Sequence, residues 1–210
     1  MQGMVMKRVV VNGKQIQPGK VVCIGRNYAA HIEELGNEMP EEMVIFMKPN
    51  TAIGNELHAT HGGEVLHYEA EIAYLYHGGR FSAAALGLDL TKRDLQSKLK
   101  GKGLPWERSK VFEGAALFSE FVALPDSDSP LGLTLHIDGR LVQKGDTTLM
   151  LYSPETILAE VQKVIPLEDG DVVMTGTPKG VGQVIAGQEF LGALTCHEET
   201  LVRIGWTAKD

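Results

Sequence analysis

The sequence predicts a mainly β fold of the α+β class, in which short helices connect many strands within a single domain of 210 residues. Glycine occurs 24 times, mostly between short apolar runs, which is typical of strands joined by tight turns. The dipeptides Asn12-Gly13 and Asp138-Gly139 each separate two such runs and are strong signals for two-residue hairpins. Residues 66–76 combine β-forming side chains with the alternation of a strand.

In chain order, the first half predicts an opening hairpin, a short helix and three further strands. Gly25 ends the strand expected at 21–25, and Gly36-Asn37 ends the helix expected at 26–35. The hairpin has strands at 4–11 and 14–16, the helix occupies 26–35, and the other strands are expected at 21–25, 44–49 and 66–76.

In the second half, a run at 81–90 leads to Thr91, which is expected to cap a helix with Asp94 at the capping-box position. Ser153 and Pro154 take the N-cap and first positions of a helix that runs to about Ile165. Strands are expected at 131–137, 140–142, 172–174, 188–194 and 201–206.

Composition excludes several classes of protein. A formal charge of −7 and a pI near 5.5, without a long basic block, argue against a general nucleic-acid binder. No apolar run approaches a membrane span and the N-terminus lacks the layout of a signal peptide, so we expect a cytoplasmic protein without a membrane partner. Cys23 and Cys196 lack metal-site spacing and are expected to be buried thiols.

Two glutamates on the strand at 66–76 are candidate metal ligands. Glu69 and Glu71 are two residues apart, so they share a face, which continues with the apolar Ala73 and Leu75. Burying two like charges is costly unless a cation compensates them, and Mg²⁺, Mn²⁺ or Ca²⁺ suits such oxygen ligands. An edge strand with a solvated acidic face accounts for the spacing equally well.

Other candidate side chains have ordinary structural alternatives. Asp89 closes an apolar run and can face a site from the end of a strand. His31 and Glu34 share a helix face, as a general base and its orienting carboxylate would, although a surface histidine beside a solvated glutamate is the commoner outcome. Lys48 is interpreted as a solvated or pocket-edge charge and Trp106 as a lid or a core plug.

Six motifs in order give a more specific indication than any one of them. Together they resemble the fumarylacetoacetate hydrolase family, and in particular its short members, the acylpyruvate hydrolases and the oxaloacetate decarboxylases or tautomerases. The similarity runs from about Val21 to the C-terminus. The motifs are GRNYAAHIEE at 25–34, FMKP at 46–49, HYEAE at 67–71, LDLTKRD at 88–94, LPW at 104–106 and TGTPKGVG at 175–182.

The resemblance implies a mixed β-roll with short helices, a homodimer, and a role for each matching residue. The implied ligands of one Mg²⁺, or Mn²⁺ in some members, are Glu69, Glu71 and Asp89. His31 and Glu34 are the implied base on a lid segment, and Lys110 matches the pocket lysine. Near the substrate oxygens the resemblance places Arg93, Gln96 and Thr177.

The implied activity is cleavage of small 2,4-dioxo acids or decarboxylation of oxaloacetate, because both reactions leave negative charge on an enolate that a divalent cation stabilises. Hydrolysis also needs water activated by His31, whereas a tautomerase needs only proton transfer. Residue identity leaves these outcomes open. It also leaves open an isomerase or decarboxylase of aromatic catabolism and a binding protein for small acids that lacks turnover.

Overall fold

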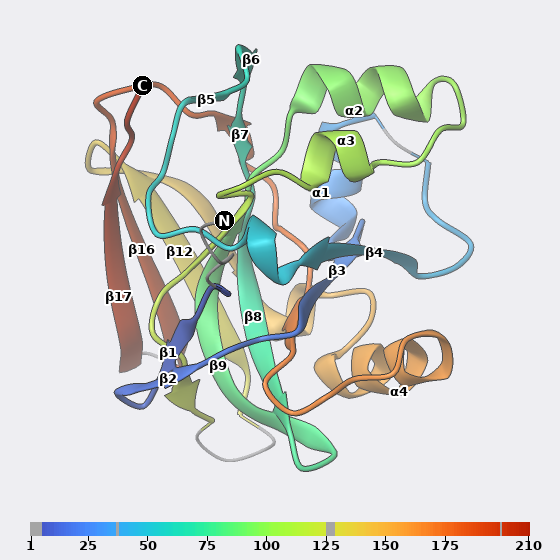
Figure 1. Ribbon diagram of the computed structural model, residues 1–210, viewed down its shortest axis with the longest axis vertical. Coiled ribbons are helices and arrows are strands. Elements are labelled where there is room, and N and C mark those ends of the chain that lie inside the picture. The colour runs from blue at the N-terminus through green and yellow to red at the C-terminus, as the bar shows by residue number, and fades with distance from the viewer. Residues whose placement is uncertain (1–5, 37, 125–128, 198) are drawn as a thin grey trace, which may run out of the picture.

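The computed structural model describes residues 6–36, 38–124, 129–197 and 199–210, and its architecture is mainly β with few short helices (Figure 1). Strands β3, β4, β8, β9, β10, β11 and β14 form one mixed sheet, in which β14 runs parallel to β3 and the other described pairs are antiparallel. These strands are Lys20–Gly25, Val44–Pro49, Ala70–His77, Arg80–Asp89, Ala116–Phe118, Val122–Ala123 and Val172–Met174.

A second, antiparallel sheet has the order β13-β12-β16-β17, with strands Arg140–Asp146, Leu131–Ile137, Glu189–Cys196 and Glu199–Thr207. Short ribbons complete the described β structure. They pair β1 with β2, β5 with β6 and β7 with β15, at Val9–Val11, Lys14–Ile16, Thr60–His61, Glu64–Val65, His67–Tyr68 and Gly182–Gln183. The mixed β-roll implied by the sequence is confirmed.

The described helices are short. The α-helices α1 to α4 span Ala29–Glu34, Arg93–Lys100, Glu107–Lys110 and Pro154–Val164, and the 3₁₀ turns η1 and η2 span Asn50–Ala52 and Thr147–Leu149. None of the described helices has the length and hydropathy needed to cross a membrane.

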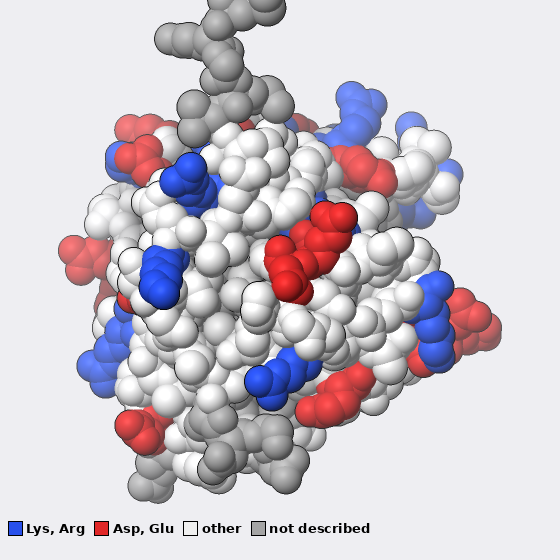
Figure 2. All heavy atoms as spheres, turned by 60° about the horizontal axis from the view of Figure 1, so that its bottom comes forward, with Lys and Arg blue, Asp and Glu red and all other residues white. Residues whose placement is uncertain are grey.

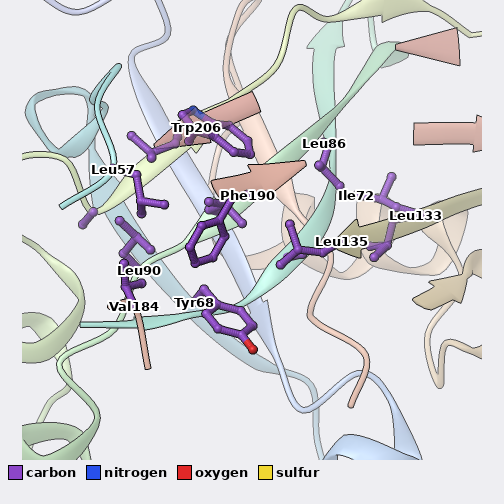
Figure 3. Packing of buried hydrophobic residues seen from close by; sticks show 14 of the residues in the cluster. Leu57, Tyr68, Ile72, Leu86, Leu90, Leu133, Leu135, Val184, Phe190 and Trp206 are labelled. Atoms are coloured by element: carbon purple, nitrogen blue, oxygen red, sulfur yellow. The ribbon is translucent and has the colours of Figure 1, made fainter. Parts of the chain in front are cut away.

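The largest hydrophobic cluster lies between the two sheets. Ile72 and Leu86 come from the mixed sheet and meet Leu133 and Leu135 of the antiparallel sheet, and Phe190 lies edge-on to Tyr68 at 5.4 Å between ring centroids (Figure 3). The sequence of a central strand that is buried on both faces is a nearly continuous run of apolar residues. On the other face of β8 and β9, a second cluster contains Ala73, Leu75, Ala83, Ala85 and Met174.

Local turn and cap signals predict several elements correctly. Asn12 and Gly13 both have positive φ between β1 and β2, and Asp138 and Gly139 do the same between β12 and β13. Ser153 caps α4 by accepting the amide of Thr156. Both cysteines are buried and free, as expected.

Other predictions need correction. The opening strand is described only at β1, and residues 4–5 of the expected strand lie outside the described residues, as does Asn37 of the expected helix stop. The helix expected at 26–35 begins only at Ala29, because Arg26 is left-handed and Tyr28 is extended. Thr91 does not cap α2; its hydroxyl accepts a hydrogen bond from Lys110 at 2.6 Å. A buried ammonium donor therefore outcompetes the local cap.

Candidate active site and metal centre

Three carboxylates converge at one end of the β8–β9 pair. Glu71 lies opposite Gly87, and the amide of Asp89 donates to the carbonyl of Glu69 at 2.8 Å, so the pleat places all three acids on the face that carries Ala73. Residues far apart in sequence are thus aligned by the register of one hairpin. The predicted strand is interrupted at Glu69, between β7 and β8.

The acidic group has the chemistry of a hard-cation site. Glu69, Glu71 and Asp89 are 6%, 2% and 1% exposed, and one carboxylate oxygen from each lies within 4.8 Å of the others. Mg²⁺, Mn²⁺ and Ca²⁺ take oxygen ligands in this way, whereas zinc and copper sites prefer nitrogen and sulfur. The donor set and its burial therefore fit a divalent ion and contradict the solvated edge strand considered above.

Three basic side chains contact the acids. Lys110 donates to Glu69 at 2.8 Å and to Asp89 at 2.7 Å, and Arg93 is paired with the other oxygen of Glu69. Lys48 lies 2.9 Å from Asp89 and also donates to the carbonyl of Lys110 at 2.6 Å. Each of these cations offsets part of the cost of burying a carboxylate.

The environments of the two glutamates separate their pKa values. Burial raises the pKa of Glu71 well above its usual range, and the charges of Asp89 and Glu69 add to that rise, although the amide of Gly176 donates to Glu71 at 2.8 Å. Burial also disfavours ionised Glu69, but Lys110 and Arg93 outweigh it and hold the pKa of Glu69 below its usual range. Glu71 is thus the acid that most lacks a compensating cation.

A histidine and a glutamate lie on α1 beside the acids. Nδ1 of His31 is 3.3 Å from Glu34, and the other oxygen of Glu34 accepts the amide of Gly180 at 2.9 Å. His31 is 6% exposed. The surface alternative for this histidine is therefore wrong: the ring is buried, and a carboxylate tied to the 175–182 loop holds one of its nitrogens.

One small cavity of about 40 Å³ joins these groups. Its volume suits a few water molecules or a metal ion with bound water. Except for Glu34, every site residue indicated by the sequence lines it: His31, Glu69, Glu71, Asp89, Arg93, Gln96, Lys110 and Thr177.

The polar residues expected near the substrate already have protein partners. Arg93 donates to Gln96 at 2.9 Å, and the hydroxyl of Thr177 donates to the carbonyl of Ala70 at 2.9 Å. Gln143, which the sequence analysis missed, donates to that hydroxyl at 2.8 Å and accepts the amide of Ala70. Gln143 therefore fixes the 175–182 loop against the start of β8.

Lys48 corrects the sequence analysis. It is 0% exposed rather than solvated, because it reaches inward from β4 to Asp89 and to backbone carbonyls. Its position in an otherwise apolar strand was the available signal, since a charge there is buried only with partners.

Trp106 lines the cavity and packs against Phe46 at 5.8 Å between ring centroids. Arg26 and Lys100 line it as well; Arg26 lies within the motif at 25–34 but was given no role there, and Lys100 lies outside the motifs.

A curled mixed sheet with a buried all-oxygen cluster beside a histidine defines a β-roll with a candidate divalent-cation site. The chain belongs to the fumarylacetoacetate hydrolase family: the family model described as fumarylacetoacetate (FAA) hydrolase C-terminal matches residues 20–205.

Curated relatives and solved structures agree with this assignment. The chain is 40% identical to the mitochondrial oxaloacetate tautomerase FAHD1 of Bos taurus over 193 residues, which cover 81% of this chain and 84% of the relative. It is 37% identical to the oxaloacetate tautomerase YcgM of Escherichia coli, with 86% and 90% covered. The crystal structure of fumarylpyruvate hydrolase from Pseudomonas aeruginosa, in complex with Mn²⁺ and pyruvate, superposes with a TM-score of 0.88 at 27% identity, covering 100% of this chain and 98% of that one.

Proposed function

We propose that this protein is a divalent-metal-dependent oxaloacetate tautomerase that interconverts the keto and enol forms. The observation that carries the proposal is the buried cluster of Glu69, Glu71 and Asp89 in one cavity with His31. The names of the curated relatives support oxaloacetate as the substrate. Tautomerisation needs one proton to leave carbon and another to reach oxygen, and a positioned base beside a cation site is suited to that exchange.

The proposed metal is Mg²⁺, with Mn²⁺ as the alternative that the Pseudomonas aeruginosa structure supports. Glu69, Glu71 and Asp89 would hold it. When bound, the ion would stabilise the negative charge that develops on the 2-oxo oxygen of the substrate. Lys110 keeps Glu69 and Asp89 in position and adds positive charge beside them.

In this proposal His31 exchanges the proton at the carbon next to the 2-oxo group. Because Nδ1 lies beside Glu34, Nε2 is the ring nitrogen left for substrate. Glu34 orients the ring and stabilises it when it is protonated, and Gly180 fixes Glu34. Arg93, Gln96 and Thr177 are proposed to contact the substrate oxygens from the cavity wall.

Decarboxylation of oxaloacetate and hydrolysis of acylpyruvates are the second candidate. The name and the bound pyruvate of the Pseudomonas aeruginosa fumarylpyruvate hydrolase favour them. Both reactions develop the same enolate charge, but only hydrolysis needs an attacking water.

We also propose a cytoplasmic location for this protein. The names of relatives from animals, Arabidopsis thaliana and fission yeast place those relatives in mitochondria.

The test follows the absorbance of the enol of oxaloacetate with metal-free protein and after addition of Mg²⁺ or Mn²⁺. We expect metal to restore catalysis, and His31→Ala to lower the tautomerisation rate by about 100-fold or more, the usual contribution of a general base. His77→Ala is the matched control, because His77 is exposed at the far end of β8.

The same variants should be assayed with acetylpyruvate and for release of CO₂ from oxaloacetate. His31→Ala should reduce acetylpyruvate hydrolysis more than decarboxylation, because only hydrolysis needs activated water. Unchanged tautomerisation in the presence of chelator would reject the metal site. An equal loss in all three reactions would reject the separate role of His31.

A further inference from the structure

Arg26 occupies a strained backbone position directly after β3. Its φ of +58° lies in the left-handed region, where residues other than glycine are uncommon. The side chain is half-buried and lines the same cavity as Glu69, Glu71 and Asp89. A strained residue persists only where its surroundings hold it, and such residues are concentrated at functional sites.

The guanidinium of Arg26 has spare hydrogen-bonding capacity. Its Nε is buried without a hydrogen-bond partner among the described residues, and one terminal nitrogen makes a long contact of 3.4 Å with the carbonyl of Glu38. In the described part of the chain no carboxylate lies within ion-pair distance of it. Lys48, Arg93 and Lys110 differ in this respect, since each contacts an acid of the cluster.

The charges around the cavity favour a ligand with two negative charges. Lys48, Lys110 and Arg93 equal the three carboxylates in number, and they contact two of them, Glu69 and Asp89, directly. The charge of Arg26 and that of the proposed divalent ion therefore exceed the acidic charge around the cavity. A substrate with two carboxylates would balance this excess better than one with a single carboxylate.

Lys100 contributes to the same positive region. Burial lowers the pKa of Lys100, and the charges of Arg26 and Arg93 lower it further, which places the three cations within electrostatic reach of one another. Lys100 also lies over the ring of Trp106, at 5.9 Å from its centroid. An anionic group among these side chains would relieve their mutual repulsion.

We propose that Arg26 is a specificity-determining residue that binds the distal carboxylate of a dicarboxylic 2-oxo acid. The inference rests on the proposed function and adds the reason why oxaloacetate is preferred to acylpyruvates with an uncharged end. A guanidinium offers paired donors in a fixed plane, which matches the two oxygens of a carboxylate. Arg93 also has a buried Nε without a hydrogen-bond partner among the described residues, but both of its terminal nitrogens already donate, to Gln96 and to Glu69.

The test uses two unreactive acids that share one chelating end. L-Lactate and L-malate are both 2-hydroxy acids, and malate has an additional distal carboxylate. Binding of each to Mn²⁺-loaded protein is measured by calorimetry and by water-proton relaxation. We expect the wild type to bind malate at least about tenfold more tightly than lactate, the usual effect of one charge-assisted hydrogen bond.

Arg26→Asn should abolish this preference by weakening malate about tenfold and leaving lactate unchanged. Asparagine tolerates the left-handed backbone, and Arg26→Gly is a second variant that removes the strain altogether. Arg26→Lys retains the charge and should keep part of the preference. Arg108→Asn, at an exposed position of α3 outside the cavity, is the matched control and should leave both affinities unchanged.

The outcomes separate this inference from the proposed function. If the wild type binds both acids equally, or if Arg26→Asn keeps the preference for malate, Arg26 is not the specificity residue, whereas the tautomerase proposal stands. If the Mn²⁺-loaded protein binds neither acid and does not act on oxaloacetate, the proposed function fails and the inference fails with it.

Discussion

At the scale of single residues, Glu71 illustrates the conflict between stability and metal binding. Its side chain is buried beside two other acids, and the amide of Gly176 is its only hydrogen-bond donor among the described residues. In the metal-free protein its raised pKa means that the folded state holds this proton more tightly than the unfolded chain does. That contribution to stability is fully present below the ordinary pKa of 4.5 and is lost as the pH rises through the raised pKa.

Glu71→Gln should therefore stabilise the metal-free protein at pH values above 4.5 and at the same time prevent tight binding of metal. Thermal unfolding in chelator, repeated over a pH series, should give a difference in Tm that grows in favour of the variant as the pH rises. Adding Mn²⁺ should raise the Tm of the wild type only. Parallel Tm curves, or an equal response to Mn²⁺, would contradict the role of Glu71.

Residue types and spacings predicted most of the site. The alternation around Glu69 and Glu71 and the helical spacing of His31 and Glu34 are local, and the structure brings these side chains into one region. The contacts of Lys48 and Arg26 were not predicted in this way. They involve distant chain segments: Lys48 donates to the carbonyl of Lys110, 62 residues later, and Arg26 lines a cavity together with Thr177.

At the scale of elements, a hydrogen bond from the amide of Gly180 to the carboxylate of Glu34 joins the 175–182 loop to α1. Gly180 has a φ of +100°, and a Cβ added there would lie 1.9 Å from the carbonyl oxygen of Val142. Only glycine lets the loop approach β13 so closely. The amide that fixes Glu34 therefore depends on the absence of a side chain at this position.

Gly180→Ala should shift the loop and release Glu34, so we expect kcat/KM for oxaloacetate to fall by about tenfold or more, as expected when a catalytic group loses its positioning. Binding of Mn²⁺, followed by calorimetry, should remain, because the acids lie on β8, β9 and the link before β8. Gly13→Ala adds the same methyl group at a positive φ, but with no atom within 4 Å. If both variants lost the same activity, strain alone would account for the effect.

Elements with local signals were predicted best. The hairpin turns and the N-cap of α4 depend on neighbouring residues, and they form as expected. The cap at Thr91 failed because Lys110, 19 residues later, supplies a stronger partner for its hydroxyl. Local preference thus holds until a buried charge from elsewhere competes with it.

At the scale of the whole molecule, the chain has a formal net charge of −7. Acidic and basic side chains are scattered over the face in Figure 2 without an extended basic area. One edge of the mixed sheet, strand β4, has no strand paired beyond it among the described residues. The exposed Met47, Leu104 and Val164 line a groove along this edge.

We propose that the protein is a homodimer, as the family resemblance implies, and that the edge of β4 contributes to its interface. Edge strands of monomers are usually protected by charges, whereas the only charged side chain of β4, Lys48, points inward. Light scattering should give a mass about twice 22.9 kDa. Met47→Lys should produce monomers, and Leu191→Lys, an equally exposed site on β16, should not.

A monomeric wild type would contradict the homodimer. Dissociation caused by Leu191→Lys but not by Met47→Lys would place the interface elsewhere.

Residue types at short spacing were enough to identify the acids, the histidine pair, the turns and the family resemblance. Which cations compensate the acids, and which cavity side chains remain available to a ligand, depends on how distant segments pack together. The pairing of β8 with β9 aligns Asp89 with Glu69, and the inward position of Lys48 depends on its contacts with Asp89 and Lys110. Arg26 shares its cavity with side chains from distant segments. Such electrostatic partners are set by distances in space, which spacing along the chain does not specify.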